Sequence, residues 1–180
     1  MPQFPTIKRA LETVMKDLQG QLRKEVRGQG HVLSGNLVDS ITYEVKTTPE
    51  GYTAVMYAAD YGIAVNMGVS AQRIPYSGRR GRGGTSLYIQ GLISYFERRG
   101  LPSREAKGAA FATAAVHKRQ GMPTRASFRF SRNGRRTGFV ETVIGNNTEK
   151  LRAVLAAKIG LLLTVEFGKE FNFEPIKIRV

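Results

Sequence analysis

An alternating run of apolar and polar residues, followed by a turn and a second extended run, constrains the fold of this chain most strongly. On one side of the first run lie Leu37, Ile41, Tyr43 and Val45. A period of two predicts a half-buried strand. The turn residues 47–51 and the run from Tyr52 to Ala58 then predict a hairpin and its second strand. We expect a short helix to follow, capped by Asp60 and ended by Gly68.

The N-terminal residues predict a long amphipathic helix. Apolar residues recur at steps of three and four from Phe4 to Val26. Pro5 suits the first turn, and Gly28 suits the end. The apolar stripe could cover the sheet or pack on a neighbouring subunit, and packing within the same chain is the favoured alternative.

The C-terminal third predicts a helix and a final strand. Phe139–Ile144 suits a short helix or anchor, and Asn147 or Thr148 could cap a longer helix after it. Residues 176–180 alternate, so we expect a strand that completes its own sheet, with exchange into a neighbouring subunit as the alternative. The fold class is therefore α+β. A long N-terminal helix and a C-terminal helix pack on a small antiparallel sheet, in a single domain over residues 1–180.

Positive charge is concentrated in the middle third of the chain. The formal net charge is +14, from 28 Lys and Arg against 14 Asp and Glu. Residues 73–136 hold fifteen of these cations and only two acids, Glu97 and Glu105, whereas residues 1–72 balance seven against seven. A cationic segment in an otherwise neutral chain predicts contact with a polyanion or an acidic protein surface.

We expect residues 72–136 to form a basic insertion within the domain. Its parts are a flexible, glycine- and arginine-rich loop over 72–85, a helical hairpin over 86–120 with small residues lining its second helix, and a basic hairpin over 122–137. The loop could be a mobile arm that contacts phosphate or an acidic groove, since arginine gives bidentate hydrogen bonds to either, or a merely solvated loop.

Aromatic residues alternate with arginines in the basic hairpin. Phe128 and Phe130 flank Arg129, and Asn133-Gly134 suits a tight turn at the hairpin tip. Such aromatics could stack on nucleic-acid bases, but core packing is the favoured interpretation. The candidate partner- or DNA-contacting residues of the basic arm are Arg73, Arg79, Arg80, Arg82, Arg125, Arg129, Arg132, Arg135 and Arg136.

No residue pattern for catalysis, a cofactor or a metal stands out. His31 and His117 have no partner at ligand spacing, the chain has no cysteine, and the carboxylates form no visible acid pair. No apolar run is long enough to span a membrane, and the first residues lack the pattern of a secretion signal. We therefore expect that the protein is not an enzyme. We also expect no cofactor, no metal site and no membrane partner.

Two short motifs resemble a known family. Ser34-Gly35-x-Leu37-x-x-Ser40-Ile41, followed by Tyr57-Ala58 and by Val65-x-x-Gly68, resembles the tail-completion or head–tail joining proteins of tailed double-stranded DNA phages. That family often has an acidic residue and an aromatic before the last glycine, where this chain has Asn66 and Met67. The motif residues to which the resemblance gives a structural role are Ser34, Gly35, Leu37, Ser40, Ile41, Tyr57, Ala58, Val65 and Gly68.

The resemblance implies a virion structural protein without an active site. Such a protein is an oligomeric ring subunit of the neck or tail through which DNA passes, assembled in the host cytoplasm. Its implied partners are copies of itself and neighbouring portal, adaptor and tail proteins. The basic arm would dock on a partner ring or contact the DNA backbone in the channel. The alternative function is a free nucleic-acid-binding protein that uses residues 73–136.

Overall fold

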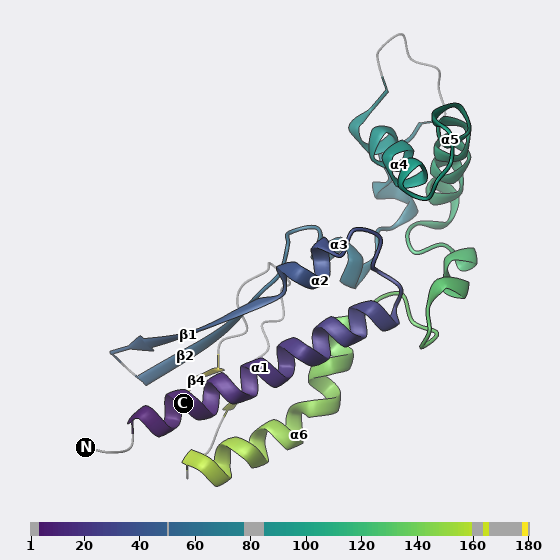
Figure 1. Ribbon diagram of the computed structural model, residues 1–180. Coiled ribbons are helices and arrows are strands. Elements are labelled where there is room, and N and C mark those ends of the chain that lie inside the picture. The colour runs from purple at the N-terminus through teal and green to yellow at the C-terminus, as the bar shows by residue number, and fades with distance from the viewer. Residues whose placement is uncertain (1–3, 50, 78–84, 160–163, 166–177, 180) are drawn as a thin grey trace.

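The computed structural model describes residues 4–49, 51–77, 85–159, 164–165 and 178–179. It confirms the α+β class: a small antiparallel sheet lies with a long N-terminal helix and a C-terminal helix (Figure 1). The helices, with η marking 3-10 turns, and the strands are α1 (Phe4–Gly28), α2 (Asn36–Ser40), β1 (Thr42–Thr48), β2 (Gly51–Tyr57), α3 (Gly62–Met67), η1 (Ala71–Arg73), α4 (Leu87–Arg98), α5 (Ser103–Gln120), η2 (Arg125–Phe130), α6 (Phe139–Ile159), β3 (Thr164–Val165) and β4 (Ile178–Arg179).

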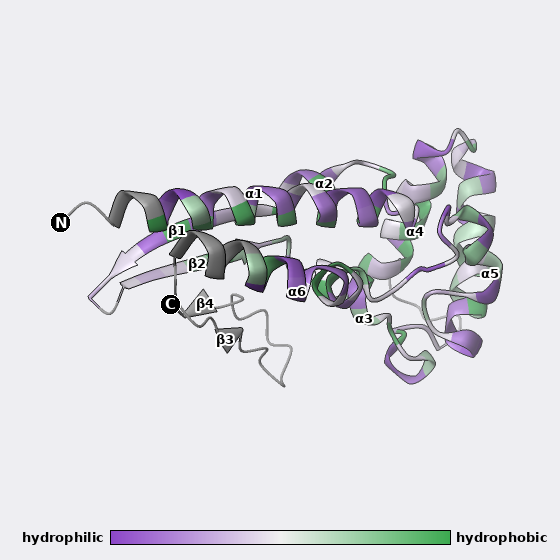
Figure 2. Ribbon diagram, turned by 90° about the horizontal axis from the view of Figure 1, so that it is seen from below, coloured by the Kyte–Doolittle hydropathy of each residue, from purple (hydrophilic) through white to green (hydrophobic). Residues whose placement is uncertain are grey.

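The main core lies between α1, the sheet and α6. The buried stripe of α1 follows the predicted helical period, and Figure 2 shows hydrophilic positions alternating with hydrophobic ones along this helix. Its buried members are Leu11, Val14, Met15, Leu18, Leu22 and Val26. The helix α6 runs antiparallel to α1, because Asn147 hydrogen-bonds to Gln21 and Lys150 pairs with Asp17 farther back along α1. Core packing within the chain is therefore the use of the α1 stripe.

The sheet has the strand order β1-β2-β4-β3. In the hairpin, Tyr43 lies opposite Met56 and Thr48 opposite Gly51, which agrees with the predicted turn. The strand β4 pairs with β2, where Ile178 faces Ala54. The predicted terminal strand thus joins its own sheet at residues 178–179, whereas the rest of 176–180 lies outside the described residues.

The prediction of a strand from Leu37 is wrong for its first residues. Residues 36–40 form α2, and β1 begins only at Thr42. Leu37, Val38 and Ile41 are all buried, and this spacing suits one face of a helix, not one side of a strand. Gly35, with φ of 78°, precedes the first turn of this helix.

Two predicted helix caps are also wrong. Tyr61, not Asp60, precedes α3, with no side-chain cap. Asn147 and Thr148 do not begin a helix, because α6 is continuous from Phe139. Asn147 is buried inside α6 and donates to the carbonyl oxygen of Val143 as well as to α1, so its side chain links two helices and caps neither.

A second, smaller hydrophobic cluster lies in the helical hairpin α4–α5. The predicted small residues of α5 are its buried stripe, with Ala106, Ala110 and Ala114 fully covered. Small side chains let α4 approach closely, and Ile89 packs against Ala110 and Ala114. This hairpin stands at the end of the molecule opposite the β1–β2 turn (Figure 1).

The helical hairpin leaves and rejoins the body of the molecule at one place. Val69 and Met122 form an isolated antiparallel bridge, in which each backbone nitrogen donates to the other's carbonyl oxygen at 2.7 Å. Farther along, the nitrogen of Gly138 donates to the carbonyl oxygen of Asn66 at 2.7 Å, just before α6 begins. The segment that carries the helical hairpin therefore leaves the body after α3 and returns to it beside the point where it left.

The predicted basic β-hairpin over 122–137 is not formed. Residues 125–130 make the 3-10 turn η2, in which the Ser127 hydroxyl donates to the carbonyl oxygen of Thr124. Beyond it, the nitrogen of Arg132 donates to the carbonyl oxygen of Gly28, and Asn133 donates to Glu25. The backbone and side-chain groups that a hairpin would pair with each other are bonded locally and to the end of α1 instead.

Candidate partner interface

The residues of the two motifs hold the corner where α2, the sheet and α3 meet. The Ser40 hydroxyl accepts a hydrogen bond from the nitrogen of Ala59 at 3.0 Å and donates to the carbonyl oxygen of Leu37 at 2.8 Å. Leu37 and Ile41 are buried in the main core, and the motif's other apolar side chains, Ala58 and Val65, pack against it. These contacts are structural.

The remaining motif residues shape turns or lie at the surface. Gly68 has φ of 75°, and a Cβ on it would lie 2.5 Å from the carbonyl oxygen of Met122. Only glycine suits this crossing without displacement of backbone. Tyr57 is exposed and its hydroxyl donates to Glu44 at 3.3 Å. Ser34 is exposed and accepts a bond from the nitrogen of Asn36 at 3.4 Å.

Asn66, which lies at the C-terminal end of α3, anchors the start of α6. Its side chain is 3% exposed. The Oδ1 atom accepts from the nitrogen of Val140 at 3.0 Å, and Nδ2 donates to the Glu141 carboxylate at 2.9 Å. The amide supplies both an acceptor for the backbone nitrogen and a donor for the carboxylate, whereas an ionised acidic side chain at this position could only accept.

The nine arginines proposed for the basic arm do not form one surface. Arg79, Arg80 and Arg82 lie outside the described residues. On the part that the structure describes, the exposed side chains are those of Arg73, Arg125, Arg129, Arg132 and Arg135, while Arg136 is half-buried. Two of these side chains are bonded within the molecule: Arg135 donates to the Thr142 hydroxyl at 2.9 Å, and Arg136 donates to the Gln29 carbonyl oxygen at 2.6 Å.

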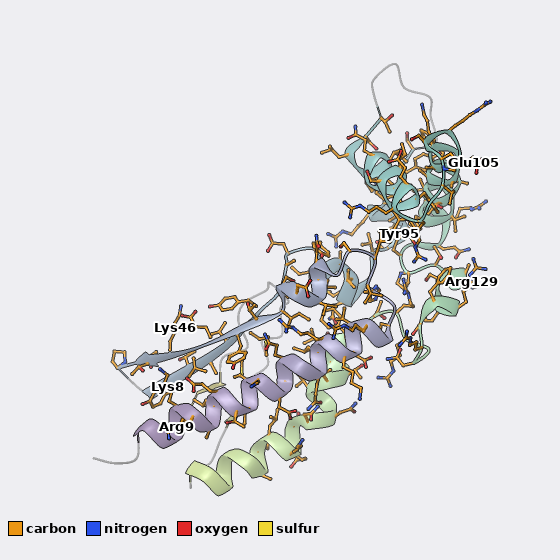
Figure 3. The ribbon with its side chains drawn as sticks, viewed as in Figure 1. Lys8, Arg9, Lys46, Tyr95, Glu105 and Arg129 are labelled. Atoms are coloured by element: carbon orange, nitrogen blue, oxygen red, sulfur yellow. The ribbon has the colours of Figure 1, made fainter. Side chains whose placement is uncertain are left out.

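Arginines and aromatic rings gather where the helical hairpin meets the body. The guanidinium of Arg129 lies 4.8 Å from the ring centre of Phe130. That of Arg99 lies 5.8 Å from the same ring and 5.4 Å from the ring of Tyr95. Tyr95 and Arg129 flank this region in Figure 3, far from Lys8, Arg9 and Lys46. Three cation–π contacts thus join two guanidinium groups and two rings.

Phe128 and Phe130 are not core residues, contrary to the favoured interpretation of the sequence. They are 43% and 48% exposed. The 3-10 turn of η2 replaces the strand on which one side would have faced a core. Phe130 instead engages the two guanidinium groups.

A groove of about 560 Å³ runs between the helical hairpin and the body. We call it the junction groove. Its mostly apolar lining comes from α3, α4, α5, the Val69–Met122 bridge and η2, and includes Val65, Leu92 and Phe96. A smaller hollow of about 210 Å³ shares His31, Val65, Tyr95, Phe130 and Arg136 with it. No residue lining either hollow is an Asp or Glu, within the part of the chain that the structure describes.

His31 and Arg136 meet at the wall shared by the two hollows. The His31 Nε2 atom lies 3.2 Å from the carbonyl oxygen of Arg136, so Nε2 donates and carries the ring proton. Burial lowers the pKa of His31, and the Arg136 guanidinium lowers it further, against the hydrogen bond to Arg136, which raises it. The ring is therefore neutral near pH 7.

The positively charged guanidinium of Arg136 is partly buried, and it forms no ion pair within the part of the chain that the structure describes. Burial lowers its pKa, Tyr95 acts in the opposite direction, and Arg99 lowers it further. Its Nε atom is buried and has no hydrogen-bond partner among the described residues. A cation in this state favours the approach of an anion.

His117 lies on the far side of the junction groove, on α5. Its Nδ1 atom and the Tyr88 hydroxyl are 2.7 Å apart. Burial lowers the pKa of His117 and raises that of Tyr88. Both groups are thus neutral near pH 7, and which of the two atoms donates depends on the tautomer of His117.

Analysis of the sequence missed Tyr95, Arg99 and the two histidines as parts of this site. The spacing of Tyr95 and Arg99 was the available signal, because residues four apart share one helix face. Among the described residues, no group of three or more His, Asp or Glu could hold a metal ion. None of the helices in those residues combines the length and apolar character needed to cross a membrane.

Comparisons with known proteins give no match. No family model, no curated protein and no solved structure matches this chain.

Proposed function

We propose that this chain is a structural subunit of a phage neck or tail, in which copies form a ring that takes part in head–tail joining or tail completion. One observation carries the proposal: a neutral body, whose corner is held by the family-like motif residues, presents a separate cationic segment beside one junction. The motif side chains of Ser40, Leu37 and Ile41 are used for packing and backbone bonds, which suits a scaffold.

A ring is built from heterologous contacts, in which one face of a subunit meets a different face of the next. This chain offers chemically distinct faces. Its body carries Lys and Arg balanced by acids over residues 1–72, whereas residues 73–136 carry a net charge of +13, as fifteen cations less two acids. We favour docking of this cationic segment on an acidic neighbouring protein, with contact to the DNA backbone as the alternative.

Deletion of the gene from the phage that encodes this chain tests the proposal. We expect DNA-filled heads and separate tails in electron micrographs of the lysate, and joined particles once the intact gene is supplied from a plasmid. Joined, infectious particles in the deletion lysate would overturn the proposal.

A free nucleic-acid-binding protein is the second candidate, favoured by the exposed Phe128 and Phe130 beside Arg129. Exposed aromatics next to arginines can stack on unpaired bases. A salt titration separates the two functions. Affinity for nucleic acid that falls steeply with salt, with a log–log slope of about −0.9 per neutralised phosphate of duplex, is expected for the second and not for a ring subunit that docks on an acidic protein.

A further inference from the structure

We propose that the junction groove is the docking site for an acidic, apolar-anchored peptide segment of a partner protein. The inference rests on the proposed function, which supplies protein neighbours, and it names the surface and the chemistry of the contact. Three features of the groove carry it: an apolar floor, a cationic wall and the complete lack of acid in its described lining.

The floor selects for apolar side chains. Val65, Leu92 and Phe96 line it without filling it, and the space of about 560 Å³ lies within the range of about 300–1,000 Å³ that is usual for binding clefts. Burying apolar side chains here would remove exposed hydrocarbon from water on both partners. A chain of peptide width suits a space of this volume.

The wall selects for carboxylates. Arg129 and Arg136 both line the groove, and Arg99 lies over the rings of Tyr95 and Phe130 at its edge. None of these three guanidinium groups has an ion pair among the described residues. Arginine binds carboxylates in a bidentate manner, and Arg129 is exposed, so a carboxylate of a docked chain can reach its guanidinium.

The same wall disfavours unpaired bases. The Phe130 ring already engages two guanidinium groups, and Tyr95 packs edge-on against Phe96, with ring centres 5.1 Å apart. The groove therefore offers cations above an apolar floor and few free ring faces. A peptide that alternates acidic and apolar side chains matches this arrangement better than a strand of stacked bases does.

Selection from a display library of short random peptides on the full-length chain tests the inference. We expect enrichment of peptides that combine Asp or Glu with large apolar residues. Affinity for an enriched peptide should fall at least about tenfold with Arg129→Glu, which reverses a lining charge, or with Ala64→Trp, which narrows the groove without changing charge. Ala64 is exposed, so this side chain can be enlarged without disturbing the core.

Two matched variants control for general effects. Arg104→Glu makes the same charge change on α5 and Ala112→Trp makes the same enlargement, and both residues are exposed and outside the groove lining. They should change affinity by less than about threefold. Equal effects of groove and control variants, or selection without acidic residues, would overturn the inference.

A short oligothymidylate distinguishes nucleic acid as the occupant. Tighter binding of this strand than of the enriched peptide, lost with Ala64→Trp, would also overturn the inference. These measurements use the purified chain, so a failure here leaves the gene-deletion result standing. Conversely, joined particles in the deletion lysate would refute the proposed function without deciding what the groove binds.

Discussion

The backbone groups of Val69 and Met122 form two hydrogen bonds with each other, each of 2.7 Å. These bonds lie where the chain crosses between the two hydrophobic clusters. A glycine stands next to each residue. A Cβ on Gly68 would lie 2.5 Å from the carbonyl oxygen of Met122, and one on Gly121 would lie 2.6 Å from that of Val69. The position of the helical hairpin relative to the body, and hence the shape of the junction groove, depends on this close crossing.

Alanine at these glycines tests the crossing. Gly68→Ala and Gly121→Ala should each lower the free energy of unfolding by about 3 kcal/mol or more, because they add a steric clash with backbone to the cost of positive φ. Gly134→Ala is the matched control, since Gly134 has φ of +73° but open space around it. It should cost only about 1–2 kcal/mol in the same urea titration. Similar costs at all three positions would show that the crossing is not tight.

Asn66 should contribute strongly to the stability of the body. Asn66→Ala removes the bonds to Val140 and Glu141 in a buried place and should cost about 2–3 kcal/mol of unfolding free energy. Asn146→Ala, the same change at an exposed position on α6, should stay within about 0.5 kcal/mol. Chemical denaturation of both variants measures the difference. An unfolding free energy unchanged by Asn66→Ala would contradict the anchoring role of Asn66.

The two motif serines should differ in their effect on stability. Ser40→Ala leaves the nitrogen of Ala59 without its acceptor and should cost about 1 kcal/mol. Ser34→Ala removes only a long, exposed bond and should stay within about 0.5 kcal/mol. Thermal unfolding of the pair, followed by circular dichroism, gives the comparison. A larger loss of stability with Ser34→Ala than with Ser40→Ala would contradict the structural role given to Ser40.

Stability should fall as the pH is lowered below the ordinary histidine value. The folded chain holds the pKa of His31 and of His117 below the ordinary histidine value of 6.5, so the unfolded chain binds more protons at acid pH. The stabilising contribution is therefore complete above about pH 6.5 and is lost as the pH falls through the lowered values. The Arg136 guanidinium contributes to the lowered pKa of His31. The polar neighbour of the His117 ring is the Tyr88 hydroxyl, 2.7 Å from Nδ1.

A variant without the titrating rings isolates this effect. His31→Asn with His117→Asn should show a smaller loss of unfolding free energy between pH 7 and acid pH than the natural chain does, whatever its stability at pH 7. Urea titrations across that range supply the comparison. Unchanged pH dependence would mean that the histidines do not contribute it.

The sequence predicted the elements whose pattern is repeated over several turns or residues. The apolar period of α1, the alternation of Tyr43 and Val45 in β1, and the alanine stripe of α5 each define a buried face locally. By contrast, α2 has only five residues, and its first apolar positions suit a helix and a strand equally well.

What the sequence could not supply depends on contacts between distant segments. Asn147 suited a cap by residue type, but its partner Gln21 is 126 positions away. The basic segment suited a hairpin, but Arg132 and Asn133 bond to the end of α1. The junction groove likewise combines His31, Tyr95 and Arg136, which no local pattern unites. Charge distribution singled out residues 73–136 as a candidate interface, and tertiary contacts decided which of its arginines line the groove.

Imaging of intact virions by electron cryomicroscopy tests the central claim most directly. In particles of the phage that encodes this chain, we predict density for its α1–α6 body, repeated as a ring in the neck or tail. Complete particles whose neck and tail are accounted for by other proteins, with no density for this chain, would contradict it.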